Sequence, residues 1–329
     1  MGIYFPTCDQ QPYKYGVLHE NSHLIVKKGF TLRDTIVANK RRAERLLQPI
    51  SVVRKYFSHP EVSHMKKAAC FSVAAMDFFP QRGEAFAGGN ALNQAIRFRT
   101  LGWETAFLGA LGTDEAGDRI EDLLRRNGVD LSGMLRLPGQ TASNRIIDDE
   151  NGERFGEEGA WQNGVYPDFS LSEADWERIT DCRLWSTHAN GNNYSEALRR
   201  KTKKNFLAVD FLHFDTYELL EEGLETVDIA YFGGVLEQLP DLISLSRRFS
   251  GIIVLTLGAG GSIAIVNGET YAEPALPLEK VLDTTGCGDA FQAGFTSEYI
   301  ESHDIRLALR KGATLGQIAA SHYGGVPWA

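Results

Sequence analysis

The sequence predicts an α/β fold in which a doubly wound parallel sheet carries a small β lid. Two observations lead to this prediction. From Met65 onward, short apolar runs typical of buried strands alternate with amphipathic segments of helical periodicity. One polar stretch, residues 143–159, interrupts the alternation with the turn Asn151-Gly152 between two strand-like runs.

The apolar runs predict the strands, because strands buried on both faces of a parallel sheet are almost continuously hydrophobic. The first follows a short basic start in MKKAACFSVAAMDFF, which begins at Met65. The remaining strands are expected at residues 105–111, 183–187, 206–211, 227–232 and 251–257.

The segments between these runs predict helices on both faces of the sheet, because their apolar residues recur at helical spacing. They cover residues 90–101, 115–127, 172–179, 195–203, 239–249, 288–300 and 305–322. The acid-rich hairpin at 143–159 is predicted to be a flap over a site, and a merely decorative surface hairpin is the alternative.

The composition is typical of a soluble globular protein, with 43% apolar and 23% charged residues. No apolar stretch approaches the length that spans a bilayer, and the first residues lack the basic-then-apolar layout of a secretory signal. The four cysteines, Cys8, Cys70, Cys182 and Cys287, form no CxxC pair. A cytoplasmic protein without a cysteine-based zinc site is therefore expected.

Charge divides the chain at the same point as the hydrophobic pattern. Residues 1–64 carry ten Lys and Arg against five Asp and Glu, which leaves a net charge of −14 for residues 65–329. We therefore expect a basic N-terminal extension of unknown role, residues 1–64, and a single catalytic domain, residues 65–329. So acidic a domain disfavours nucleic-acid binding and is compatible with small substrates, including cationic ones.

The stretch DTTGCGDAF, residues 283–291, carries the clearest chemical signal. It lies where a loop leads into a helix, and ligands of open α/β sheets bind at such loops. Gly286 and Gly288 leave room for an anion at the positive end of the helix dipole. Asp289, in the first turn, is suited to take a proton from an alcohol that attacks phosphorus. Taken alone, the pattern would also fit a simple helix cap.

Two further glycine clusters accompany this stretch, which favours the chemical interpretation. Gly88-Gly89-Asn90 opens a long segment that ends at Met134, and TLGAGGS, residues 256–262, follows a buried strand. The second cluster would let a nucleotide approach the backbone.

Together these pieces resemble the ribokinase family, also called the PfkB-type carbohydrate kinases. The resemblance extends from Met65 to about the C-terminus. GGNALNQA with the following G-x-L-G-x-D-x-x-G pattern is similar to the N-terminal signature of the family, TLGAGGS to its nucleotide-binding turn, and DTTGCGDAFQAGF to its C-terminal signature. The resemblance implies a ribokinase-like fold and phosphoryl transfer from ATP to an alcohol.

The resemblance also implies roles for individual residues. Asp289 would be the catalytic base, and Gly286, Cys287 and Gly288 the anion hole. Nucleotide contacts would come from Thr256, Gly258 and Gly261. Contacts to the hydroxyls of the substrate would come from Asp77, Gly89, Asn90 and Asn93.

Three sites depart from the family pattern, and one of them is Cys287, which replaces the usual alanine of the C-terminal signature. The Gly-Asp pair near the end of the first strand is Ser72-Val73 here, so one sugar contact is missing. The N-x-x-E motif has lost its asparagine but keeps Glu237, which would hold Mg²⁺ through water. ATP and Mg²⁺ are the implied cofactors, while a monovalent cation and a homodimer stay open.

The charge of the predicted pocket bears on the substrate. Residues 76–90 and 143–164 contain three arginines against eight acids, which disfavours a second phosphate and suits an ammonium group. Only ten residues separate Asp77 from Gly88, so the lid is small. Both traits, with GVYPDFSLSEADW and the ending SHYGGVPW, resemble the fructoselysine 6-kinases, which phosphorylate the 6-hydroxyl of a fructosamine. Glu157 or Glu158 on the flap would pair with the substrate amine.

Two other functions stay open. A fructokinase or another simple sugar kinase would share the catalytic residues, and a substrate panel would separate it from a fructosamine kinase. A non-catalytic sugar-binding sensor would need no base, so an intact Asp289 disfavours it. A NAD-dependent dehydrogenase is disfavoured because no GxGxxG follows the first strand.

Overall fold

The computed structural model describes residues 66–148, 154–156, 159–213 and 217–327. All of them belong to one compact unit, Ser63–Ala329. The basic extension predicted for residues 1–64 lies outside the described residues, and so do Glu157 and Glu158.

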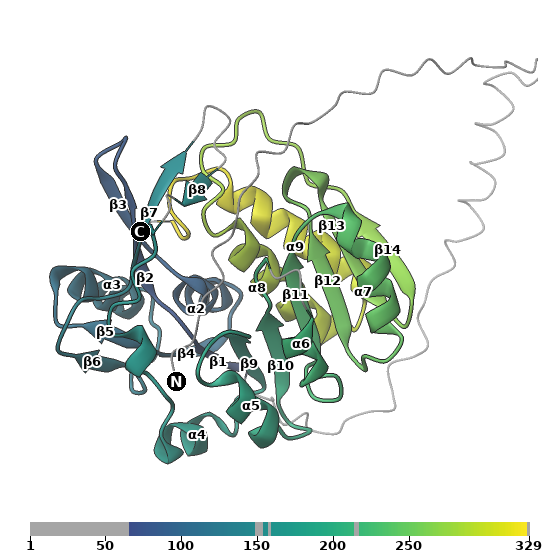
Figure 1. The fold of residues 1–329 in the computed structure, drawn as a ribbon, viewed down its shortest axis with the longest axis horizontal. Helices are drawn as coiled ribbons and strands as arrows, with labels where there is room; N and C mark the ends of the chain where they lie inside the picture. The colour runs from purple at the N-terminus through teal and green to yellow at the C-terminus, as the bar shows by residue number, and fades with distance from the viewer. Residues whose placement is uncertain (1–65, 149–153, 157–158, 214–216, 328–329) are drawn as a thin grey trace, which may run out of the picture. The chain divides into compact units, whose positions relative to one another are not determined.

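An eight-stranded sheet forms the centre of this unit, in the order β14-β13-β12-β11-β10-β9-β1-β4 (Figure 1). The six strands from β4 to β12 are parallel, and β13 and β14 extend the sheet in antiparallel fashion. Their bounds are β1 Lys67–Phe71, β4 Glu104–Leu108, β9 Leu184–His188, β10 Phe206–Asp210, β11 Ile229–Gly233, β12 Ile252–Thr256, β13 Ser262–Val266 and β14 Glu269–Glu273.

The parallel strands are apolar throughout because both of their faces are buried. In β1, Ala68 and Cys70 join one hydrophobic cluster, whereas Ala69 and Phe71 join a second cluster on the opposite face. Helices complete each cluster, so the sheet is doubly wound, as the sequence predicts. The first cluster includes α2 Asn90–Thr100, α3 Glu115–Arg126, α8 Cys287–Ser302 and α9 Ile305–Ala319; the second includes α4 Glu173–Ile179, α5 Tyr194–Arg200, α6 Glu218–Glu221 and α7 Leu239–Ser246.

Within the described residues, no helix has both the length and the apolar character needed to cross a membrane.

A smaller sheet of four strands, β3-β2-β7-β8, carries the polar hairpin. Its strands are β2 Ala75–Phe79, β3 Glu84–Gly88, β7 Ser143–Asp148 and β8 Arg154–Gly156. Strands β7 and β8 pair in antiparallel fashion, with Asp148 opposite Arg154, as the Asn-Gly signal predicts. Strand β7 joins β2 in parallel, which brings the hairpin beside the segment that contains Asp77.

Two apolar runs that the sequence presents as single strands are each divided between two sheets. MKKAACFSVAAMDFF contains both β1 and β2. Residues 105–111 contain the end of β4 and the start of β5 Ala110–Gly112, which pairs with β6 Leu135–Leu137. The division of the second run occurs at Gly109, where a Cβ atom would lie 2.5 Å from the Phe107 ring. Hydrophobicity does not reveal this change of sheet, because both halves are buried.

Candidate active site

Three chain segments that lie far apart in the sequence meet at the carboxyl edge of the parallel sheet. From β1 the chain goes outward to β4, and it later returns to β9 on the other side of β1. The strand order therefore reverses at β1, and such switch points are where open α/β sheets bind ligands. The last residue of β10, the first residue of α2 and the first turn of α8 are linked here by hydrogen bonds.

Helix α8 starts at a turn that only glycine can form. Gly286 has a φ of 70°, and a Cβ atom on it would lie 2.6 Å from the Cα of Gly325. Gly288 is in the first helical turn, and a Cβ atom there would meet nothing within 4 Å. The glycine at 286 is thus required by the protein itself, whereas the space beside Gly288 is open.

The backbone N–H groups of this turn differ in whether they donate a hydrogen bond within the protein. The Cys287 N–H donates to the Thr284 carbonyl at 3.2 Å, so it faces the turn itself. In the described part of the chain, the N–H groups of Gly286 and Gly288 donate to no protein acceptor. Unpaired N–H groups at a helix start attract anions, and the helix dipole adds to that attraction.

Asp289 follows directly, and its carboxylate is held by two amides from α2. Asn90 Nδ2 donates to Oδ1 at 3.0 Å, and Asn93 Nδ2 donates to Oδ2 at 2.7 Å. The two asparagines are three residues apart on a helix and therefore lie on the same face. Each carboxylate oxygen accepts one amide, so the plane of the carboxylate is fixed beside Gly288.

Asp77 lies close to the same helix start. It is 6% exposed, and a side chain at Gly88 would collide with its carboxylate. Gly89 caps α2 with a φ of 96°, where a Cβ atom would lie 2.8 Å from the Val73 carbonyl oxygen. Gly88 therefore leaves room for the Asp77 carboxylate, and Gly89 lets the backbone at Val73 pass close to the start of α2.

One acceptor in this group is buried without a donor. Asn93 is 2% exposed, and within the described residues its Oδ1 receives no hydrogen bond. A buried polar atom without a partner costs roughly 1–3 kcal/mol. This oxygen lies against the C-terminal segment, because a Cβ atom on Gly325 would be 2.5 Å from it.

The predicted nucleotide turn follows β12. Gly258 and Gly261 both have positive φ, 55° and 90°, and Leu257 N–H donates to the Gly261 carbonyl at 2.8 Å. A side chain at Gly261 would collide with the Glu273 carbonyl, so this glycine shapes the turn. Thr256 ends β12, and its hydroxyl donates to the Phe232 carbonyl at 3.2 Å. This turn and Asp289 both lie at the carboxyl edge of the sheet.

Glu237 is exposed on a short 3₁₀ turn, Leu236–Gln238, after β11. The Gly234 N–H donates to the Thr256 carbonyl at 3.0 Å, which brings this loop beside the end of β12. Among the residues described, no three acidic, histidine or cysteine side chains form a metal-binding cluster. A Mg²⁺ ion with few protein ligands usually keeps several waters and binds substrate phosphates, and an exposed carboxylate such as Glu237 could contact such a water.

Several residues of the site are absent from the sequence prediction. Ser72, described above only as a departure from the pattern, donates to Asn90 Oδ1 at 3.0 Å. Asp210 accepts from Asn90 Nδ2 at 3.1 Å. Asp210 ends a predicted buried strand at the carboxyl edge of the sheet. An acid at the end of such a strand could have indicated a site residue.

His188, which ends β9, also lies at this edge. Its Nε2 is 2.9 Å from the Tyr166 hydroxyl. Burial lowers the pKa of His188 below its ordinary value of 6.5, although a hydrogen bond with Asn190 and the charge of Asp210 oppose this effect. The ring is therefore neutral near pH 7.

The C-terminal segment packs against the glycine turn that precedes α8. Gly324 N–H donates to Asp283 Oδ2 at 2.9 Å, and Asp283 Oδ1 also accepts from the Thr285 N–H at 2.8 Å. Arg97 donates to the Gly325 carbonyl at 3.1 Å. The glycines in the ending SHYGGVPW thus have a structural purpose, because they let the segment pack against Gly286.

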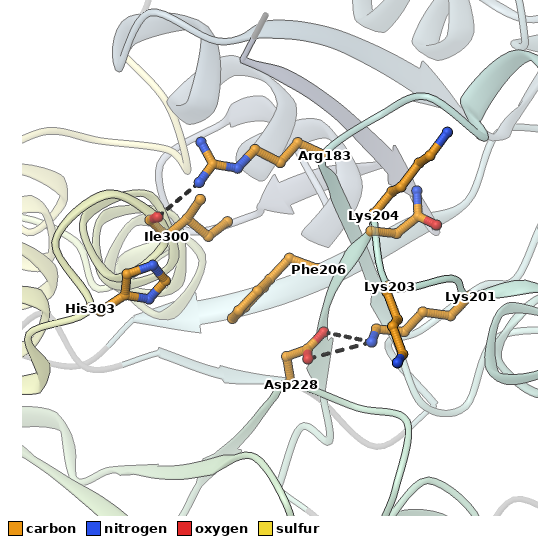
Figure 2. Close-up of a pocket in the computed structure, with 9 residues that line it drawn as sticks. Arg183, Lys201, Lys203, Lys204, Phe206, Asp228, Ile300 and His303 are labelled. Atoms are coloured by element: carbon orange, nitrogen blue, oxygen red, sulfur yellow. Dashed lines mark hydrogen bonds and ion pairs between the residues drawn. The ribbon is translucent and has the colours of Figure 1, made fainter. Parts of the chain in front are cut away.

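A cavity of about 350 Å³ lies at the opposite edge of the sheet (Figure 2). Its residues lie at the amino ends of β9, β10 and β11 or at the end of α8, and include Arg183, Lys201, Lys203, Asp228 and His303. Figure 2 shows Lys201 paired with Asp228 at 3.1 Å and Arg183 donating to the Ile300 carbonyl at 3.0 Å. None of the predicted site residues lines this cavity, so it is separate from the candidate active site.

The chain is similar in sequence to known proteins. The sequence profile of the pfkB family carbohydrate kinases matches residues 77–327. A fructoselysine 6-kinase from Escherichia coli K12 is 26% identical over 263 residues, which cover 79% of this chain and 99% of the relative. A fructosamine kinase from Bacillus subtilis is 25% identical over 256 residues, which cover 76% of this chain and 89% of the relative.

Solved structures agree on the fold. The structure of Arabidopsis thaliana ribokinase complexed with ribose and ATP matches with a TM-score of 0.67 at 20% identity, and the match covers 79% of this chain and 94% of that one. This likeness confirms the predicted ribokinase-like fold. Because the family profile spans most of the chain, the protein belongs to the pfkB family of carbohydrate kinases and is a phosphotransferase.

Proposed function

We propose that the protein transfers the γ-phosphoryl group of ATP to the 6-hydroxyl of a fructosamine such as fructoselysine, with Asp289 as general base. The observation that carries this proposal is the Asp289 carboxylate, held by two amides at the start of α8 beside the open space at Gly288. A fixed carboxylate next to an anion-attracting helix start suits an alcohol and a phosphoryl group that meet there.

The chemistry follows from that arrangement. Asp289 takes the proton of the sugar hydroxyl as its oxygen forms a bond to the γ-phosphorus. The bond between the γ-phosphorus and the bridging oxygen breaks, ADP leaves, and the proton passes from Asp289 to solvent. The N–H groups of Gly286 and Gly288 stabilise the negative charge on the transferred group. Mg²⁺, when bound with ATP, neutralises phosphate charge, and Glu237 would hold its water.

Sugar binding would depend on the residues around the start of α2. Asp77 would accept hydrogen bonds from hydroxyl groups, and Gly89, Asn90 and Asn93 lie at the same helix start. Thr256, Gly258 and Gly261 would contact the nucleotide, since the space beside Gly258 is open and its backbone is accessible.

A cationic substrate is favoured by charge. Arg82 is the one arginine in residues 76–90, and its guanidinium lies 4.0 Å from the Phe79 ring centre and 4.4 Å from that of Tyr323. It also lies 3.9 Å from the Asp283 carboxylate. Arg82 is thus engaged by the protein rather than offered to a second phosphate. Glu157 or Glu158 would receive the substrate ammonium, and the names of the two curated relatives agree with such a substrate.

The test compares fructoselysine and fructose as acceptors with ATP, following the phosphorylated product by mass spectrometry. We expect kcat/KM to be at least about tenfold higher for fructoselysine, as expected for one retained ion pair in a partly desolvated site. Replacing both flap acids, Glu157→Gln with Glu158→Gln, should remove most of that preference. The matched control, Glu218→Gln with Glu225→Gln, changes the charge equally at exposed positions and should keep it. Equal efficiency on both sugars would instead indicate a simple sugar kinase.

A further inference from the structure

The amide of Asn90 is fixed by three side chains from three separate segments. Its Nδ2 donates to Asp210 Oδ2 at 3.1 Å and to Asp289 Oδ1 at 3.0 Å, and its Oδ1 accepts from the Ser72 hydroxyl at 3.0 Å. An ionised carboxylate only accepts, so the amide nitrogen must face the two acids. An amide nitrogen has two hydrogens, and each acid receives one.

Asp210 is itself anchored at the end of β10. It is 8% exposed, and its Oδ1 accepts from the Leu212 N–H at 2.7 Å. Leu212 has a φ of 56°, in the left-handed region that bulky residues rarely adopt. Such a backbone persists only where the surroundings hold it, and here it directs an N–H toward Asp210. One oxygen of Asp210 thus accepts from the turn that follows β10, and the other accepts from Asn90.

We propose that Asp210 is a positioning residue for phosphoryl transfer: through Asn90, it holds the carboxylate of Asp289 in place. This inference rests on the proposed role of Asp289 as the base. Without Asp210, the amide of Asn90 loses one of its two acceptors and can rotate away from Asp289. Proton transfer is sensitive to placement, since an error of about 1 Å can cost about 100-fold in rate.

Asn90 also separates two like charges. The carboxylate oxygens of Asp210 and Asp289 both lie within hydrogen-bond distance of one nitrogen, and its two N–H groups face them. Loss of the amide would leave two carboxylates facing each other, which is unfavourable. Removal of Asn90 should therefore harm Asp289 at least as much as removal of Asp210.

A double-mutant cycle tests this mechanism, with kcat and both KM values measured for Asp210→Ala, Asn90→Ala and the double variant. Asp210→Ala should lower kcat about 10-fold to 100-fold, with both KM values nearly unchanged. The double variant should be no slower than Asn90→Ala alone. Asp210→Asn should lower kcat less than Asp210→Ala, because its single amide oxygen can still accept from Asn90 once it gives up the Leu212 N–H.

The matched control is Asp228→Ala at the opposite edge of the sheet. Asp228 also accepts a backbone N–H, from Leu207 at 2.6 Å, and pairs with Lys201. Its removal should lower the unfolding temperature and leave kcat unchanged. If Asp210→Ala fails to fold, Asp210→Asn takes its place in the cycle, and its smaller loss of kcat should also disappear in the Asn90→Ala background.

Losses of kcat that multiply in the double variant would overturn the proposal, and so would an unchanged kcat in Asp210→Ala. The variant Asp289→Asn separates this failure from a failure of the proposed function. If Asp289→Asn keeps its rate, the base assignment is wrong. If Asp289→Asn is inactive while the cycle is additive, only the positioning role of Asp210 is wrong.

Discussion

Replacement of Gly288 by alanine should separate the activity of this kinase from its stability. Gly288 has ordinary helical backbone angles, and a Cβ atom would meet nothing within 4 Å. Alanine is favoured over glycine in helices by about 0.5–1 kcal/mol, so the variant should unfold at the same temperature or about 1–3 °C higher. The new methyl group would occupy the space through which a phosphoryl oxygen must reach the Gly288 N–H. Loss of one such donor costs about 100-fold to 1000-fold in kcat.

The assay pairs thermal unfolding with ATP-dependent phosphorylation, and Gly286→Ala provides the contrast. At Gly286 the added Cβ atom would lie 2.6 Å from the Cα of Gly325, in a left-handed backbone. That variant should lose activity and also at least about 1–2 kcal/mol of stability. A Gly288→Ala enzyme with full kcat and normal KM would refute the idea that phosphoryl transfer occurs over this turn.

Three further predictions follow from particular residues. Burial lowers the pKa of His188, so protons bind the unfolded chain more tightly; stability should fall below about pH 6.5, by at most about 1.4 kcal/mol per pH unit. Urea unfolding at a series of pH values should show that the free energy of unfolding falls less steeply with falling pH in His188→Gln than in the wild type. An identical pH dependence would contradict the lowered pKa of His188. Iodoacetamide should alkylate half-buried Cys287 faster than Cys70 or Cys182, because both are buried and burial raises the pKa of Cys182 to about 11. ATP should slow that reaction and the accompanying loss of activity. Peptide mapping would contradict the prediction if it found Cys70 or Cys182 alkylated before Cys287. Asp77→Asn should raise KM for the sugar about 10-fold and leave KM for ATP unchanged, whereas a change in the ATP value alone would exclude a sugar contact.

The sheet was predictable because its strands are buried on both faces. Residues 206–211, for example, are nearly all apolar, and β10 covers all of them except the last. The division at Gly109 was not predictable in the same way. It depends on the fit of Gly109 beside the Phe107 ring and the Ser72 carbonyl, and hydrophobic periodicity does not report such contacts.

The candidate site shows the same limit. The glycines and acid of DTTGCGDAF predict an anion-binding turn from sequence alone, because they lie close together in the chain. The contact from Asn90 to Asp210 spans 120 residues, and the support of Gly286 by Gly325 depends on how the C-terminal segment folds back. Such partners emerge only from the packed structure. The roles of Glu157 and Glu158 stay predictions, because both lie outside the described residues.

The most direct test of the central claim is the rate of fructoselysine phosphorylation by the wild-type enzyme and by Asp289→Asn. Asparagine has nearly the same size as aspartate but cannot accept the proton of the hydroxyl. The account predicts that kcat falls by about 100-fold to 10,000-fold while KM for the sugar stays close to the wild-type value. An Asp289→Asn enzyme that phosphorylates the sugar at the wild-type rate would contradict it.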